Sequence, residues 1–201
     1  QMCIRDRKKA NESGHPIVFD PVGVGASKFR KDTAIKLLNE VHFSVIRGNI
    51  SEIKTLYEWS ENSYGVDAKK DDIITEDNQK KVIRMAKELA VKTKAVIVIT
   101  GETDLVTDGE TVYFIKNGVP EMARITGCGC MLDGVIAGFI GANQGNILEA
   151  TVTAVSAMGI CGEYARENAK GTGTLKVHLI DAMSNIDETW MERSNQIESR
   201  S

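Results

Sequence analysis

Residues suited to phosphate chemistry occur in four glycine-containing segments of the sequence. They are segments 20–25 (DPVGVG), 47–52 (RGNISE), 100–102 (TGE) and 126–130 (TGCGC). In the last segment, glycines at the start of an expected helix let backbone N–H groups approach an anion at the positive end of the helix dipole. The segment is neither a Walker loop nor a dinucleotide fingerprint, since position 132 is Leu. Its glycines either bind phosphate or form only a tight turn.

Two carboxylates and one guanidinium lie in the first two segments. Asp20 and Glu52 are suited to Mg²⁺, which keeps several waters and takes few protein carboxylates. Arg47 is suited to bidentate contact with a phosphate. Taken singly, each is better explained as a helix cap, a surface acid or a surface salt bridge. Their shared place at the ends of expected strands, where ligands bind open α/β sheets, favours a site.

The cysteines have different expected roles. Cys130 lies at a helix N-terminus, which tends to lower a thiol pKa, so it could act as a base or lie close to the reacting group. Cys128 and Cys130 form a C-x-C pair, but zinc would need two further ligands at suitable spacing, so a metal site here is weakly supported. Cys161 falls within an expected helix and is predicted to be a small buried hydrophobic residue.

Strands and helices alternate along the chain. Apolar runs predict strands at 15–19, 43–46 and 95–99, and Asp108-Gly109 predicts a hairpin between 105–107 and 111–115. The predicted helices share an amphipathic or small-residue pattern and cover 29–41, 50–59, 77–93, 130–142, 147–168 and 174–186. Asn49 or Ser51 is the expected N-cap of the second helix, and 69–78 is an expected outward loop. This alternation predicts an α/β sheet covered by helices.

Composition excludes several classes of protein. The chain has 201 residues, which suits one domain or one domain with a fragment of another. A net charge of −3 provides no basic footprint for nucleic acid, and no apolar stretch reaches the length of a membrane span. Four cysteines are too few for a disulfide framework, so a cytoplasmic location is expected. Residues 1–7 lack the apolar region of a secretory signal and fit no clear helix or strand pattern.

The ordered motifs resemble those of hydroxyethylthiazole kinases, which belong to the ribokinase-like superfamily. The resemblance runs from about 15 to 186 and rests on 18–26 (VFDPVGVGA), 45–52 (VIRGNISE), 99–102 (ITGE), 126–130, 171–174 (GTGT) and 179–182 (LIDA). It implies a ribokinase-like, mostly parallel sheet with helices on both faces. It also implies that Mg-ATP phosphorylates the hydroxyl of 4-methyl-5-(2-hydroxyethyl)thiazole in thiamine salvage.

The resemblance implies roles for individual residues, which fall into four groups: ATP binding by Arg47, Asn49 and Thr100; substrate binding by Val22, Gly23 and Gly127; Mg²⁺ binding by Asp20 and Glu52; and catalysis by Cys130. Cys130 occupies the position where many ribokinase-like enzymes carry a catalytic aspartate. The family also implies a homotrimer, with the thiazole alcohol and ATP as the small-molecule partners.

The family's early strands and helices have no counterpart here, so the chain is expected to be an N-terminally truncated piece. We expect residues 1–14 to lie outside the family, 15–187 to form the kinase-like domain, and 188–201 to be a polar tail. Two alternatives stay open: another ribokinase-like kinase acting on a pyrimidine or pyridoxal alcohol, and an inactive fragment that binds only nucleotide. Cys130 in place of aspartate argues against most of the former.

Overall fold

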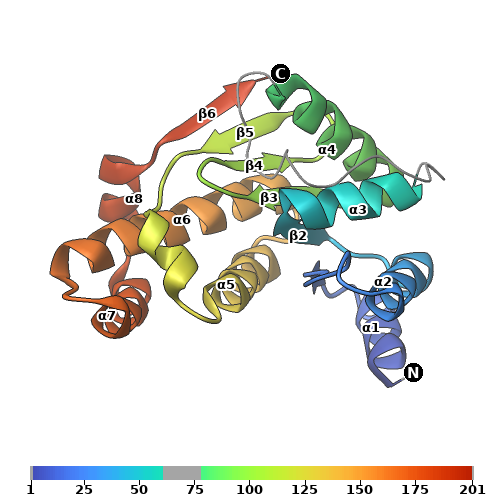
Figure 1. Cartoon of the computed structure of the whole chain (residues 1–201), viewed down its shortest axis with the longest axis horizontal. Coiled ribbons are helices and arrows are strands. Elements are labelled where there is room, and N and C mark those ends of the chain that lie inside the picture. The colour runs from blue at the N-terminus through green and yellow to red at the C-terminus, as the bar shows by residue number, and fades with distance from the viewer. Residues whose placement is uncertain (1, 61–77, 201) are drawn as a thin grey trace.

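A computed structural model describes residues 2–60 and 78–200 and contains a six-stranded sheet (Figure 1). Its strands, in spatial as well as chain order, are β1 (Val18–Phe19), β2 (Val45–Asn49), β3 (Val96–Thr100), β4 (Asp104–Thr107), β5 (Val112–Ile115) and β6 (Ile197–Arg200). The expected α/β class is confirmed. The sheet is mixed rather than mostly parallel, because β1, β2 and β3 pair in parallel whereas the hairpin β4–β5 and strand β6 add antiparallel pairings.

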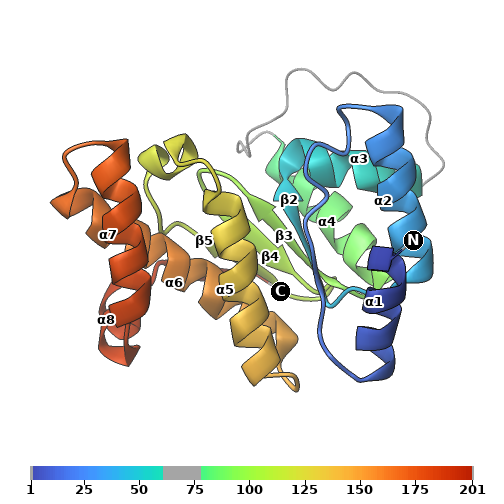
Figure 2. The same ribbon diagram turned by 90° about the horizontal axis from the view of Figure 1, so that it is seen from below.

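Helices cover both faces of this sheet, as the sequence predicts. They are α1 (Met2–Glu12), α2 (Lys28–Glu40), α3 (Ile50–Ser60), α4 (Gln79–Thr93), α5 (Cys128–Ala142), α6 (Ile147–Asn168), α7 (Thr172–Asn185) and α8 (Glu188–Ser194), with a 3₁₀ helix, η1 (Pro120–Arg124). Helices α3 and α4 lie on one face, and α5 and α6 on the other (Figures 1 and 2). Within the described part of the chain, none of the helices is long and apolar enough to cross a membrane.

The central strands explain why both faces must be covered. Ile97 and Ile99 of β3 belong to the core beneath α3 and α4, whereas Val96 and Val98 belong to the core beneath α5 and α6. Successive side chains of a strand point to opposite faces, so a continuous apolar run leaves neither face suited to water. The sheet is therefore the middle layer of three.

The first residues form a helix, contrary to the expectation for 1–7. Helix α1 is strongly polar in composition, with Ile4 packed against the core, so it offers few apolar residues from which periodicity could reveal it. It is instead held by contacts with the segment after α2. The Asn11 side chain exchanges two 2.9 Å hydrogen bonds with the backbone of His42, and Lys8 lies 2.7 Å from Glu40. Tertiary contacts of this kind stabilise helices that propensity alone does not.

The polar tail expected at 188–201 is also structured. Helix α8 packs on α6, where the Trp190 and Tyr164 rings lie 4.6 Å apart, and β6 pairs antiparallel with β5. Strand β6 reads Ile-Glu-Ser-Arg, and mostly exposed polar residues are typical of an edge strand. Its polarity concealed its place in the sheet.

Some expected boundaries move. Strand β1 has two residues rather than the expected run 15–19, and β2 begins at Val45 and extends to Asn49. The extension places Arg47 inside a strand rather than after it. The expected loop 69–78 lies outside the described residues except for Asn78, which precedes α4.

Candidate active site

The carboxyl ends of β2 and β3 bring two of the predicted ATP-binding residues together. Asn49 and Thr100 are register partners at the last positions of these parallel strands. Thr100 Oγ1 lies 3.4 Å from the carbonyl oxygen of Gly48 as a hydrogen-bond donor. Gly48 and Thr100, 52 positions apart in sequence, therefore meet at one edge of the sheet, as the alternation of strands and helices predicts.

Asn49 also begins helix α3 through a reciprocal cap. Its Oδ1 accepts from the backbone N–H of Glu52, and Glu52 Oε2 accepts from the backbone N–H of Asn49, both at 2.9 Å. This capping-box arrangement satisfies two donors that a helix start leaves open. Asn49 is thus the N-cap, and Ser51, the other candidate, lies inside the helix.

Glu52 joins this helix start to the loop after β1. Its Oε1 accepts a 2.8 Å hydrogen bond from the backbone N–H of Gly23, whose φ of +63° favours glycine. The neighbouring Val22 side chain is exposed, while the Val22 carbonyl accepts from Arg30 Nη1 at 2.8 Å. The Gly-rich loop 22–25 is therefore tied to α3 by one carboxylate.

Arg47 is a buried residue with two acidic partners. Its side chain is only 8% exposed, and its Nη2 donates to Asp20 Oδ2 at 2.6 Å. Its Nε and Nη2 also donate to the two carboxylate oxygens of Asp133, at 2.9 and 2.8 Å. A salt bridge does occupy Arg47, but it is buried and bidentate rather than a weak surface pair.

Asp133 was not singled out from the sequence. It lies 86 positions from Arg47, so no local pattern joins the two. One signal was available: Asp133 stands four residues after Gly129, and side chains four residues apart share a helix face. A carboxylate on the face of a presumed phosphate-binding helix start is a candidate partner for an arginine.

The buried Asp20 carboxylate has fewer hydrogen-bond partners than Arg47 and Asp133 have. Burial raises the pKa of Asp20 to about 7, although Arg47 lowers it, and the charges of Asp133 and Glu52 add to the rise. Its Oδ1 is buried and has no hydrogen-bond partner among the described residues. An unpartnered carboxylate oxygen is a strong attractor for a cation or a polar ligand.

These donors fit a hard divalent cation. Carboxylate oxygens are the ligands Mg²⁺ prefers, and the orphaned Asp20 Oδ1 lies close enough to Glu52 for the two charges to interact. Among residues 2–60 and 78–200 there is no group of three or more His, Cys, Asp or Glu placed to hold a metal. Mg²⁺ commonly takes only one or two carboxylates together with substrate phosphates, so this donor set is adequate for it.

The TGCGC segment opens helix α5, as predicted. Gly127 is the N-cap at φ +89°, a left-handed conformation that favours glycine. Gly129 lies against Arg47, because a Cβ built there would stand 3.0 Å from Nη2 and 3.1 Å from Nη1. The first turn of α5 therefore lies directly against the Arg47 guanidinium. Cys130 is exposed in the same turn.

The other cysteines are packed differently. Burial raises the pKa of the Cys128 thiol, against a smaller lowering effect of Arg47. Cys161 is fully buried, and burial raises its pKa to about 11. The prediction that Cys161 is a small hydrophobic core residue is confirmed.

A cleft of about 920 Å³ opens beside Arg47. Its lining residues come from the ends of β2 and β3, the segment after β5, η1 and the first turn of α5, and they include Arg47, Thr100, Asp104, residues 116–120, Cys128 and Gly129. This volume lies within the usual range of about 300–1,000 Å³ for a small-molecule site.

Asp104 on the cleft wall was also missed. Burial raises the pKa of Asp104 to about 7, although its Oδ1 accepts a 2.8 Å hydrogen bond from the backbone N–H of Gly101. Its position four residues after Thr100, where the loop that follows β3 ends and β4 begins, was the available signal.

The predicted site residues divide into two groups. Arg47 and Thr100 line the cleft, and Asp20, Asn49, Glu52 and Gly23 connect to it through the hydrogen bonds above. Val22, Gly127 and Cys130 face solvent and do not line this cleft. The nucleotide candidates Arg47 and Thr100 thus lie at the cleft with the metal candidate Asp20 beside them. Gly23 is joined to Glu52, and the other substrate and catalytic candidates face solvent.

Comparison with known proteins identifies the family. A model of the hydroxyethylthiazole kinase family matches residues 1–189. The chain belongs to the hydroxyethylthiazole kinase family. The match includes residues 1–14, which we expected to lie outside the family.

Individual hydroxyethylthiazole kinases are similar along nearly the whole chain. The "Hydroxyethylthiazole kinase" of Clostridium acetobutylicum is 46% identical over 99% of this chain and 74% of its own length. That of Clostridium beijerinckii is 43% identical over 98% of this chain and 71% of its own. The hydroxyethylthiazole kinase structure from Pyrococcus horikoshii OT3 superposes with a TM-score of 0.85 at 28% identity, covering 98% and 70% of the two chains.

A more distant structure shows the wider fold. The pyridoxal kinase of Staphylococcus aureus, solved with AMP-PCP and pyridoxal, matches with a TM-score of 0.51 at 17% identity, over 92% of this chain and 62% of that one. At this identity the likeness concerns the fold alone. Together with the hydroxyethylthiazole kinase structure above, it agrees with the predicted ribokinase-like fold. As a member of the hydroxyethylthiazole kinase family, the protein is a phosphotransferase.

Proposed function

We propose that this protein transfers the γ-phosphoryl group of ATP to the hydroxyl of 4-methyl-5-(2-hydroxyethyl)thiazole, forming the thiazole phosphate and ADP in thiamine salvage. The observation that carries the proposal is the meeting of Arg47, Thr100 and the glycine-capped start of α5 at one cleft, in a chain that belongs to this family. Phosphoryl transfer depends mainly on positioning and charge stabilisation, and these are the groups that supply both.

ATP is assigned to the cleft. Arg47 has its Nε and Nη2 engaged by carboxylates, while Nη1 has no hydrogen-bond partner among the described residues, so this nitrogen is the one that would meet a phosphate. The amides of the α5 start and the helix dipole would share the same negative charge. Thr100 and Asn49, at the two strand ends, complete the proposed nucleotide contacts.

Asp20 and Glu52 are proposed to hold Mg²⁺ with the nucleotide. The unpartnered Asp20 Oδ1 supports this role. When bound there, the ion would neutralise charge on the phosphates. Binding of a cation would also relieve the repulsion among the carboxylates that surround Arg47.

The thiazole alcohol is assigned to the open side of the α5 start. Gly127 is solvent-facing, and Val22 and Gly23 belong to the loop that Glu52 ties down. The exposed Val22 side chain would supply apolar contact for the thiazole ring. The hydroxyl would then approach the phosphate from the side opposite to the nucleotide.

Cys130 is proposed as the base that accepts the hydroxyl proton. Its exposed thiol lies in the first turn of α5, next to Gly129, which lies against Arg47. Cys130→Ala is expected to lower kcat by about 10²-fold with little change in the KM for ATP, as for loss of a general base. Steady-state kinetics with both substrates measures this, and Cys161→Ala is the control for loss of a thiol. Full turnover by Cys130→Ala would remove the residue from the mechanism.

The deciding experiment is a kinase assay. The protein is given Mg-ATP and the hydroxyethylthiazole, and the phosphorylated thiazole is detected by mass spectrometry, with the Clostridium acetobutylicum relative assayed in parallel. Product from both proteins supports the proposal. Product from the relative alone, with ATP bound by both, would favour the nucleotide-binding alternative. Product only from a pyrimidine or pyridoxal alcohol would replace the substrate.

The homotrimer and the cytoplasmic location are part of the same proposal, since only the family resemblance supports them. Light scattering coupled to size-exclusion chromatography measures the first. A mass of three chains is expected, and a monomer would contradict it.

A further inference from the structure

The wall of the cleft opposite Arg47 is built around one buried amide. Asn117 is 6% exposed and follows β5, in the segment 116–120 that lines the cleft. Its Oδ1 accepts from Ser156 Oγ at 3.1 Å and from the backbone N–H of Gln196 at 2.8 Å. Its Nδ2 donates to the Ser194 carbonyl at 2.8 Å and to Glu163 Oε1 at 3.2 Å.

This amide has no hydrogen-bonding capacity left for a ligand. An amide side chain offers two donors and two acceptor lone pairs, and all four are used. Asn117 therefore acts on the cleft through its backbone rather than through direct contact. Glu163 extends the arrangement, since the same Oε1 accepts a 2.8 Å hydrogen bond from the backbone N–H of Gly118.

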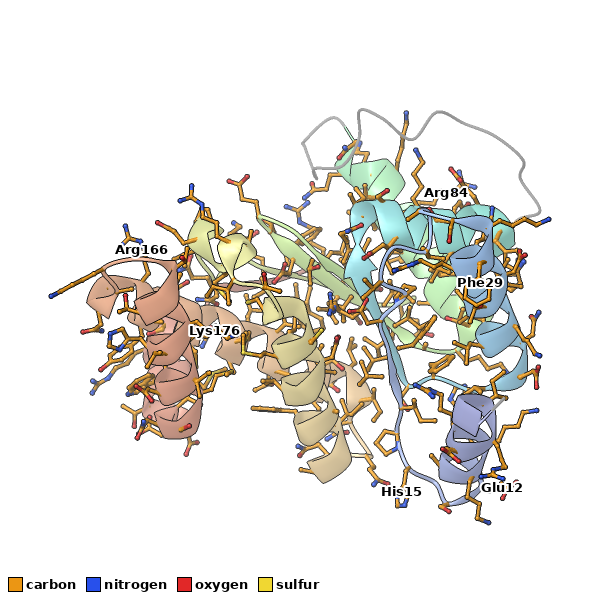
Figure 3. All side chains as sticks on the ribbon, turned by 60° about the horizontal axis from the view of Figure 1, so that its bottom comes forward. Glu12, His15, Phe29, Arg84, Arg166 and Lys176 are labelled. Carbon is orange, nitrogen blue, oxygen red and sulfur yellow. The ribbon has the colours of Figure 1, made fainter. Side chains whose placement is uncertain are left out.

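Helix α6 fits closely against this wall. A Cβ at Gly159 would lie 2.6 Å from Asn117 Cβ and 2.7 Å from its carbonyl carbon and oxygen. One turn further along, a Cβ at Gly162 would collide with Met122 Sδ. Arg166, labelled in Figure 3, continues along the helix and pairs with Glu121 at 2.6 Å. The wall is thus held against α6 at three successive points.

The amide also joins two distant parts of the chain. Ser194 ends α8 and Gln196 precedes β6, and the Gln196 carbonyl accepts from the backbone N–H of Lys116 at 3.0 Å. The connection from α8 to β6 therefore contacts the cleft wall through the Asn117 side chain and through this backbone hydrogen bond.

We propose that Asn117 is a positioning residue for nucleotide binding, which holds the wall 116–120 in the conformation that a nucleoside triphosphate requires. The inference rests on the proposed function, because it assigns ATP to this cleft. Asn117 follows β5, which β3 and β4 separate from β2 and Arg47, so we expect it to act on ATP affinity rather than on the chemical step. A loosened wall must be ordered again on binding, and that cost appears in the affinity.

The test compares graded variants of the full chain. Asn117→Asp keeps the shape, removes both donors and places a carboxylate beside Glu163, whereas Ser156→Ala removes one of the two hydrogen bonds to Oδ1. We expect Asn117→Asp to raise the KM for ATP and the calorimetric Kd for Mg-ATP by about tenfold or more, with a smaller rise for Ser156→Ala. The kcat at saturating ATP and the KM for the thiazole alcohol should stay within about twofold.

Thr151→Val is the matched control. Thr151 is fully buried on α6, the helix that also carries Ser156, and its Oγ1 donates to the Ile147 carbonyl at 2.7 Å. This variant should lower thermal stability and leave the Kd for Mg-ATP unchanged. If Asn117→Asp does not fold, Ser156→Ala alone tests the inference, because it leaves the other three hydrogen bonds of Asn117 in place.

Two results would overturn the inference. One is loss of stability in the Asn117 and Ser156 variants, as in Thr151→Val, without any change in the Kd for Mg-ATP. The other is a wild-type protein that does not bind Mg-ATP. A wild-type protein that binds Mg-ATP but does not phosphorylate the thiazole alcohol would sink the proposed function alone, since the Kd measurement needs no thiazole.

Discussion

The two sides of the cleft are held by opposite kinds of polar chemistry. On one side is a charged cluster, made of Arg47, Asp20, Asp133 and Glu52. On the other is the amide network, made of Asn117 with Ser156, Glu163 and the backbone of 194–196. The charged cluster has one cation among three carboxylates and leaves Asp20 Oδ1 without a described partner. The amide network uses every donor and acceptor of its central side chain.

The difference means that the charged cluster can still pair with another charged group, whereas the amide network can only fix the shape of the cleft wall. Buried charges are costly unless fully paired, so an incompletely paired cluster gains free energy when a ligand or cation completes it. A saturated network gains nothing from a new polar partner and instead rigidifies its surroundings. We infer that the charged cluster engages the phosphates and metal, while the amide network shapes the cleft for the remainder of the nucleotide.

Removal of the single cation is expected to have the largest effect. Arg47→Ala leaves Asp20 and Asp133 buried together without their shared partner. Breaking a buried pair in this way costs about 3–5 kcal/mol of unfolding free energy. Loss of the proposed phosphate contact should also lower kcat/KM for ATP by about 10²-fold or more. Urea denaturation and steady-state kinetics measure the two effects.

Arg47→Lys is the control for this prediction, because it keeps the charge and loses the fork that meets both Asp133 oxygens. It should recover part of the stability and less of the activity. An Arg47→Ala protein as stable and active as the wild type would show that Arg47 neither stabilises the cluster nor contacts a phosphate.

Removal of one acid is expected to have a smaller effect. Asp133→Asn keeps the shape but replaces a charged acceptor pair by a single carbonyl facing Arg47. A cost of about 1–3 kcal/mol in unfolding free energy is expected, the range for a hydrogen bond to a charged group. Urea denaturation measures it. Asp187→Asn, at the exposed N-cap of α8, is the control, and an equal loss in both variants would mean that Asp133 has no special part in the cluster.

The charged cluster also shows where sequence reasoning succeeds. The segments that contain Arg47, Glu52 and Thr100 were predicted to meet because they follow apolar runs, and strand ends meet at one sheet edge whatever the details of packing. Their individual roles came from the family resemblance. Parts of the site that depend only on alternation and on glycines at a helix start are readable from local patterns.

Residues whose role depends on distant partners were missed. Asp133 meets Arg47 across 86 positions, and Asn117 meets Gln196 across 79. Their types and local spacing are ordinary, so nothing short of the packed fold brings them together. The same reason explains α1 and β6: each is stabilised by contacts with a distant segment rather than by an apolar pattern of its own.

A third variant tests how closely the charged cluster touches α5. Gly129→Ala places a Cβ 3.0 Å from Arg47 Nη2, so the guanidinium must shift away from the helix start. A loss of about tenfold in kcat/KM for ATP is expected, about 1.4 kcal/mol of transition-state stabilisation. Gly134→Ala is the matched control, since a Cβ there meets nothing within 4 Å and only improves helix propensity. Equal values of kcat/KM for ATP in the two variants would show that the contact between the start of α5 and Arg47 does not matter for catalysis.

The smallest effect concerns Asp104, an acid on the cleft wall outside the charged cluster. Burial raises its pKa in the folded protein to about 7 from an ordinary 3.8. Between these values the unfolded chain has released the proton and the folded chain keeps it. Stability therefore falls as the pH rises through this window and levels off above it. Asp104→Asn retains a carbonyl acceptor for the Gly101 N–H and removes the ionisation.

Asp104→Asn should therefore raise the unfolding free energy by about 1–2 kcal/mol at about pH 8 and change it little at about pH 3, where both states are mostly protonated. Urea denaturation at the two pH values measures this, with Asp108→Asn in the exposed hairpin turn as the control. A gain of equal size at both pH values would mean that packing and not ionisation is responsible. A loss of stability at the higher pH would mean that the Asp104 carboxylate has a favourable partner in the folded protein. Asp104 would then belong with Asp20 and Asp133, the acids that are paired with Arg47.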